Sequence, residues 1–164
     1  MKNILTPLAL LACLGFITAC EKAEDPFVPR EVAPALVQIV NATYQTDFAT
    51  EPNVPSDSTA PLALKIRVLK LDKTNILDHT KGIDSIPVPN LNVKLLKRDG
   101  TALGEGTTDA SGTLTLTKTW AELGLVPNYA NPPLKYYKGQ IIRLSWTGAV
   151  NGVAFTRFSS VSVR

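Results

Sequence analysis

PVPNLNVKLLKRDGTALGEGTTDASGTLTLT, residues 87–117, is the stretch that decides the fold. Its first apolar residues alternate with polar ones, at Leu91, Val93 and Leu95. Alternation with a period of two is typical of a strand that buries one face. Residues 113–117 repeat the pattern as alternating threonine and leucine. Asp99-Gly100 and the run Asp109–Gly112 lie beside these strands and are typical of tight turns. The stretch therefore predicts antiparallel strands joined by short turns.

The chain upstream continues the β pattern. Residues 35–40 are mostly apolar and predict a first strand, whereas residues 47–60 are rich in Pro, Ser, Thr and Asp and predict a loop. Residues 62–71 alternate, but the phase slips after Val68, where Leu69 is also apolar. We expect a β-bulge at Val68-Leu69, because one extra residue restores the facing of the strand.

Downstream, residues 142–146 alternate in the same way, and a final strand is expected through Phe155 to Val163. Asn151-Gly152 stands between Val150 and Val153, which strongly favours a two-residue hairpin. Residues 120–124 predict a helix of one or two turns, closed by a glycine. About seven strands result, so we expect residues 35–164 to form a single all-β sandwich.

Residues 86–117 resemble bacterial Ig-like domains and the carboxypeptidase-regulatory, transthyretin-like modules. The resemblance rests on apolar alternation, a turn, and a Thr-Asp-x-x-Gly sequence that begins at Thr108. It implies a β-sandwich of Ig-like or transthyretin-like type. Such modules are common in exported proteins of adhesion, polymer handling and envelope assembly, so the resemblance is nearly silent on function.

The N-terminus has the pattern of an export signal. Lys2 precedes an apolar run at residues 4–19, which is shorter than the ~20 residues that a membrane-spanning helix needs. The run ends in small residues, so residues 1–19 are predicted to be a signal peptide.

Ile17-Thr18-Ala19-Cys20 resembles the lipobox of bacterial lipoproteins. The resemblance implies that the Cys20 thiol is diacylated, that the chain is cut before Cys20, and that the lipid anchors the protein. An ordinary signal peptide with a cysteine at that place by chance is the alternative. We expect residues 20–34 to be a flexible tether and the protein to be an outer-membrane lipoprotein. The acidic cluster at residues 21–25 is either a surface-export signal or a solvated part of the tether.

Composition excludes several function classes. The chain has 17 basic and 14 acidic residues, and a net charge of +3 is too small to indicate nucleic-acid binding. One histidine and two cysteines are too few for a Cys/His zinc site. We therefore expect no metal and no cofactor.

Catalytic groups are sparse. His79 is the only histidine, and a Ser-His-Asp triad would have to bring it to a serine such as Ser85 or Ser111. Asp72, Asp78 and Asp84 are spaced six apart without the Asp/Asn/Gly run of a calcium loop, so solvated carboxylates are the preferred interpretation. We expect that the protein is not an enzyme, and a hydrolase is the more distant alternative.

Residues 125–138, which we call the tyrosine segment, hold Tyr129, Tyr136 and Tyr137 among prolines and lysines. Such tyrosines either contact a sugar or peptide, or pack the segment onto the sandwich. The expected function is a non-catalytic, membrane-tethered envelope module for binding or assembly, with an envelope protein or glycan as partner and these three tyrosines as contacts. A glycan- or small-ligand-binding lipoprotein that uses the same tyrosines is the alternative.

Overall fold

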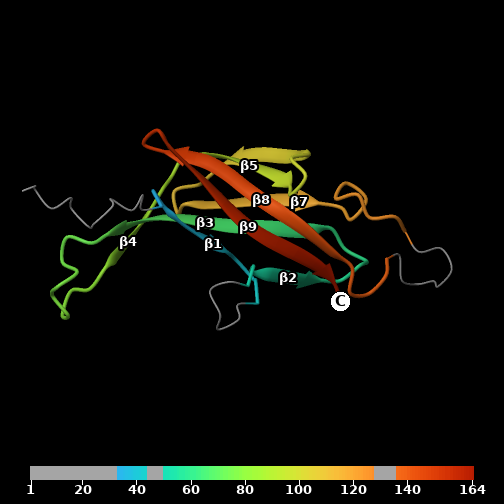
Figure 1. The fold of residues 1–164 in the computed structure, drawn as a ribbon, viewed down its shortest axis with the longest axis horizontal. Coiled ribbons are helices and arrows are strands. Elements are labelled where there is room, and N and C mark those ends of the chain that lie inside the picture. The colour runs from blue at the N-terminus through green and yellow to red at the C-terminus, as the bar shows by residue number, and fades with distance from the viewer. Residues whose placement is uncertain (1–32, 44–49, 128–135) are drawn as a thin grey trace, which may run out of the picture. The chain divides into compact units, whose positions relative to one another are not determined.

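The computed structural model describes residues 33–43, 50–127 and 136–164 (Figure 1). These residues form nine strands in two sheets, and no helix occurs among them. The expected signal peptide and the tether as far as residue 32 lie outside the described residues.

The first sheet is built around one long strand. It contains β1 (Leu36–Ile39), β3 (Leu62–Asp72), β4 (Asp84–Pro87) and β7 (Thr113–Lys118). β1 pairs with one side of β3, while β7 and β4 pair with the other side in succession, and every pairing is antiparallel. The long β3 therefore determines where the other three strands of this sheet lie.

The second sheet has five strands in the order β2-β9-β8-β5-β6. Its members are β2 (Asn53–Ser56), β5 (Asn92–Lys97), β6 (Ala102–Thr107), β8 (Ile141–Val150) and β9 (Val153–Val163). β2 runs parallel to β9, and the other neighbours are antiparallel.

The core collects the inward-facing side chains of both sheets. In β3 and β5 the buried residues alternate with exposed ones, as their sequence pattern predicts. Trp146 is one of the two largest side chains in this core, and its Nε1–H donates to the Ser159 hydroxyl at 3.1 Å, so its only polar atom is satisfied. The predicted all-β sandwich is confirmed.

The predicted bulge at Val68-Leu69 is wrong. The register between β1 and β3 runs without a shift from Leu36↔Leu69 to Ile39↔Ile66. Instead, β3 changes its partner on the far side: Val68 N–H donates to Gly112 O at 2.8 Å, and Val88 N–H donates to Val68 O at 3.0 Å. Val68 is thus the residue of β3 at which pairing with β7 stops and beyond which pairing with β4 starts. Leu69 is also buried, on the opposite face of the strand.

Three other expectations need correction. Residues 120–124 form hydrogen-bonded turns that end at Gly124, with φ +89, and do not make a helix. The short strand β2 occurs within residues 47–60, which were expected to be a loop. The short strand β4 is a further strand that the sequence pattern did not predict, so the described residues contain nine strands in place of about seven. Pro55 lies within β2, a place that proline tolerates because this strand is at the edge of its sheet.

The predicted turns are confirmed. Asn151 and Gly152 both have positive φ, 52° and 80°, and join β8 to β9 with Val150 opposite Val153. Asp99-Gly100 joins β5 to β6, and the Asp99 carboxylate accepts the Thr101 N–H at 2.9 Å. Among the described ranges, no helix has the length and apolarity needed to cross a membrane.

Gly112 and Gly152 offer a matched test of the Val68 junction. Both have positive φ, but a Cβ at Gly112 would lie 2.4 Å from Val68 O, whereas a Cβ at Gly152 would meet nothing within 4 Å. Gly152→Ala should cost only the backbone strain, about 1 kcal/mol. Gly112→Ala should cost about 2–4 kcal/mol, because the β3 carbonyl must also move. Urea unfolding of both variants measures the difference, and equal losses would contradict the junction.

Candidate functional site

The chain enters the tyrosine segment through a capping box. The Glu122 carboxylate accepts the Thr119 N–H at 2.7 Å and the Thr119 hydroxyl at 2.9 Å. In return, Glu122 N–H donates to the Thr119 hydroxyl at 3.3 Å. These bonds, from the Thr119 N–H above all, together with Lys118, lower the pKa of Glu122 to about 2. The carboxylate is therefore ionised at neutral pH and holds the turn that carries Trp120.

Trp120 and Tyr136 form an aromatic pair within the core. Their ring centroids are 6.1 Å apart at 46°, and the residues are 2% and 6% exposed. Trp120 Nε1–H donates to Asp57 O at 3.0 Å, which ties the turn at residues 119–122 to the chain that follows β2. The pair lines a small pocket of about 180 Å³ together with residues 58–61 and Thr119.

The structure therefore separates the three tyrosines that the sequence grouped as contacts. Tyr136 packs on Trp120 in the core, whereas Tyr137 is 55% exposed beside it. Tyr129 lies outside the described residues. Adjacent residues often point to opposite sides of an extended chain, so Tyr136 fixes the segment and leaves Tyr137 at the surface.

A second feature is the hairpin made by the end of β3, the loop and β4. We call residues 70–86 the arm, and it extends beyond the two sheets in Figure 1. The side chains on the arm include several exposed large apolar residues, namely Ile76, Leu77, Ile83 and Ile86. Leu77 is 97% exposed, which is exceptional for a leucine in a domain that buries most of its apolar strand residues.

Local hydrogen bonds organise the arm. Asp72 accepts the Thr74 N–H at 2.9 Å and its hydroxyl at 2.5 Å, and Asp78 accepts the same two groups of Thr80 at 3.0 and 2.6 Å. The threonine hydroxyls, and then the backbone N–H groups, lower the pKa of both aspartates. The two carboxylates thus build turns, and within the described ranges no group of three or more His, Cys, Asp and Glu could hold a metal ion.

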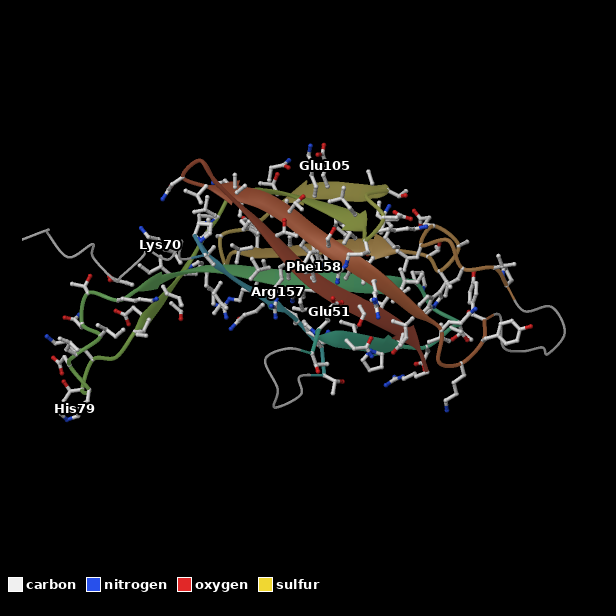
Figure 2. All side chains as sticks on the ribbon, viewed as in Figure 1. Glu51, Lys70, His79, Glu105, Arg157 and Phe158 are labelled. Carbon is white, nitrogen blue, oxygen red and sulfur yellow. The ribbon has the colours of Figure 1, made fainter. Side chains whose placement is uncertain are left out.

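The residues considered for a catalytic triad have other surroundings. His79 is exposed at the tip of the arm (Figure 2). The Ser111 hydroxyl donates to Asp109 at 2.6 Å and accepts from the Thr113 hydroxyl at 2.8 Å, so it belongs to the turn before β7. Ser85 lies in β4 opposite Leu71 of β3, and its side chain is exposed. In the part of the chain that the structure describes, no hydrogen bond joins His79 to a serine.

Sequence reasoning missed the arm as a candidate site. The available signal was Ile76-Leu77, two large apolar residues in the middle of a polar connection. Cys20 lies outside the described residues, so its lipidation stays a prediction. Comparisons of the chain with protein-family models, with curated proteins and with solved structures give no match.

Proposed function

We propose that this chain is an outer-membrane lipoprotein whose sandwich binds a protein partner of the cell envelope and performs no catalysis. The observation that carries the proposal is the arm, a projecting hairpin on which several large apolar side chains are exposed to solvent. Exposed apolar groups of this kind mark contact surfaces, because burying one Leu or Ile side chain contributes about 1.5–3 kcal/mol.

The arm suits a protein surface better than a lipid surface. It carries three lysines and three aspartates, which sum to zero with His79 neutral. A membrane-binding loop gains from anionic lipid when it is basic, and this arm has no such gain. Its Asp72 and Asp78 turns also hold the loop in one conformation, so less entropy is lost when a partner binds.

The chemistry of the arm does not favour an enzyme. General acid–base catalysis needs a group whose pKa lies near the working pH. Hydrogen bonds lower the pKa of Asp72 and Asp78, which moves both carboxylates away from that range. These residues serve the conformation of the loop, and the apolar side chains between them serve the contact.

The tether would keep the arm close to the proposed lipid anchor at Cys20. β1 begins at Leu36, which is opposite Leu69, and Leu69 is in turn opposite Pro87 at the base of the arm. The tether therefore reaches the sandwich at the end from which the arm projects. Thirteen residues, 20–32, extend at most about 45 Å, so the proposed partner lies in the same layer of the envelope.

Charging the tip of the arm should abolish binding without unfolding the domain. Leu77→Asp should leave the free energy of unfolding within about 0.5 kcal/mol, because the side chain packs on nothing. A photo-crosslinking amino acid at residue 77 of the full chain, in cells, should give one discrete protein adduct. The adduct should be lost when Ile76→Asp is added.

Val153 provides the matched control. It is 52% exposed on a strand away from the arm, so a crosslinker there should give no adduct. Adducts to lipid alone at residue 77, or the same adduct at both positions, would rule out the proposed contact.

Lipidation makes a separate prediction. Mass spectrometry of the mature wild-type chain should find Cys20 at the N-terminus with acyl chains attached, and Cys20→Ala should leave an uncut or soluble precursor. Cys13→Ala is the control and should change nothing, because Cys13 would leave with the signal peptide. An unmodified Cys20 in a soluble mature chain would refute the lipoprotein assignment.

A glycan-binding role is the second candidate, and the exposed Tyr137 next to the Trp120–Tyr136 pocket favours it. Titration with a soluble peptidoglycan fragment should change tryptophan fluorescence in the wild type. Tyr137→Ala should remove this change and leave stability intact. Tyr136→Ala should instead cost about 3–5 kcal/mol of unfolding free energy, as expected for a buried aromatic residue. Binding that persists in Tyr137→Ala would exclude this candidate.

A further inference from the structure

The strand β7 has a free edge. It pairs with β3 on one side, and none of the described strands lies along its other side. Its inner face is covered by β6, since a Cβ at Gly106 would lie 2.7 Å from Leu114 Cδ1. Thr115 and Thr117 alternate with the leucines of this strand and are exposed. The free edge and the outer face of β7 are therefore both open to solvent.

Thr115 and Thr117 direct their backbone N–H and C=O groups to this edge. In an antiparallel pair, residues alternate between those that bond to their opposite number and those that point away. Val68 N–H donates to Gly112 O at 2.8 Å, so Gly112 and every second residue after it bond to β3. The residues between them point away from β3. In agreement, the C=O of Lys65, which is opposite Thr115, accepts a hydrogen bond from the β1 side.

Thr113 belongs to the same outward set, but its backbone groups are already used. Asp109 N–H donates to Thr113 O at 2.8 Å, and Thr113 N–H donates to the Asp109 carboxylate at 3.0 Å. These two bonds close the turn before β7. Of the outward residues in β7, Thr115 and Thr117 therefore remain for pairing with another strand.

The other edge strands carry features that oppose such pairing. Sheets protect their free edges with prolines, charges, bulges or short length. β2 and β4 have four residues each and contain Pro55 and Pro87. β6 carries Glu105, and its register with β5 shifts. At β1, Ile39 already has an interaction partner. By contrast, β7 has six residues, and residues 113–117 contain no proline and no charge.

We propose that a second copy of this chain pairs with the edge of β7, antiparallel and about a twofold axis at Leu116, so that the first sheet continues from one copy into the other. In this register Thr115 of each copy is opposite Thr117 of the other. The register uses every outward N–H and C=O group of both threonines, whereas an axis at Thr115 would place Thr117 against the occupied Thr113. This surface goes beyond the proposed function, because it shares no residue with the arm.

The edge suits its own copy in particular. A twofold axis brings the residues near it against their own counterparts, so a charge there would meet a like charge. Residues 113–117 carry none, and the next residue, Lys118, is paired with Glu122 of its own chain at 3.2 Å. Threonine meets threonine on the outer face, and Leu116 meets its own copy on the inner face, which are favourable cross-strand pairs. Six residues a copy make a small contact, so the association is weak and is measured at high protein concentration.

Disulfide trapping tests the register. Full chains with Thr115→Cys and with Thr117→Cys are mixed in detergent and oxidised with copper phenanthroline. The mixture should give a disulfide-linked dimer, because residues opposite each other in a bonded pair have Cα atoms about 5.5 Å apart, within the range of a disulfide. Either variant alone should give little dimer, since its cysteines would be diagonal neighbours about 7–8 Å apart. The wild type, which has Cys13 and Cys20, gives the background. No dimer from the mixture, or as much from one variant alone, would overturn the proposal.

A pair of lysines tests the contact without cysteines. Thr115→Lys with Thr117→Lys places like charges opposite each other across the axis and should weaken the association at least about tenfold. The melting temperature of the dilute protein should not change, because both side chains are exposed. The matched control is Ala154→Lys with Thr156→Lys, which adds the same charges at the same spacing on exposed positions of β9. Light scattering over a range of protein concentrations should show association in the wild type and the control. Association that survives the β7 lysines would mean that the copies meet elsewhere, and the proposal would fail.

Amide hydrogen exchange shows which backbone groups take part. In the wild type, exchange of the Thr115 and Thr117 amides should slow as the protein concentration rises. The Leu114 and Leu116 amides should be protected at every concentration, because they bond to β3. Protection of residues 115 and 117 that does not depend on concentration would mean that another part of the same chain covers the edge, and would overturn the proposal. Leu77→Asp should leave all these results unchanged, so failure at the arm and failure at the β7 edge are told apart.

Discussion

The two hydrogen bonds of the Val68 peptide groups are the constraint on which the rest of the structure depends. Through them one residue of β3 bonds to the turn before β7 and to the residue after β4. Gly112 makes this possible, because its backbone approaches Val68 O more closely than any side chain permits. The core lies on the β7 side of this junction and the arm on the β4 side. A single strand can therefore belong to a packed sheet at one end and to an exposed hairpin at the other.

Local sequence patterns were sufficient for the elements that are governed by local physics. The period of two in β5 and β7, and the Asn151-Gly152 turn, predicted strands and a hairpin that the structure contains. The phase slip at Val68-Leu69 was visible, but its cause was a change of partner and not a bulge. Partner choice depends on Gly112 and Val88, which are 44 and 20 positions away from Val68 in the chain, and no local pattern contains that information.

The candidate surfaces were harder to predict for the same reason. Tyr136 and Tyr137 are chemically identical neighbours, and the buried one is the one that packs on Trp120, a contact that the sequence does not reveal. Arg157 belongs to a strand in which its neighbours Thr156 and Phe158 are exposed, so alternation alone predicts an apolar residue at its place. Its direction follows from its pairing with the buried Trp146, which local alternation does not reveal. The arm was also missed, although an Ile-Leu pair in a polar loop is itself an anomaly that the sequence contains.

The adjacency of Leu36, Leu69 and Pro87 also has a mechanical consequence. A pull between Ala33 and the arm loads the β1–β3 ladder from its Leu36 end, in the direction that opens an antiparallel pair like a zipper. The hydrogen bonds of this ladder then carry the force one after another instead of together, so β1 yields before the β8–β9 hairpin bears any load. A domain held by its first strand and by its arm would therefore lose β1, together with the buried side chains of Val37 and Ile39, before the β8–β9 pairing is loaded.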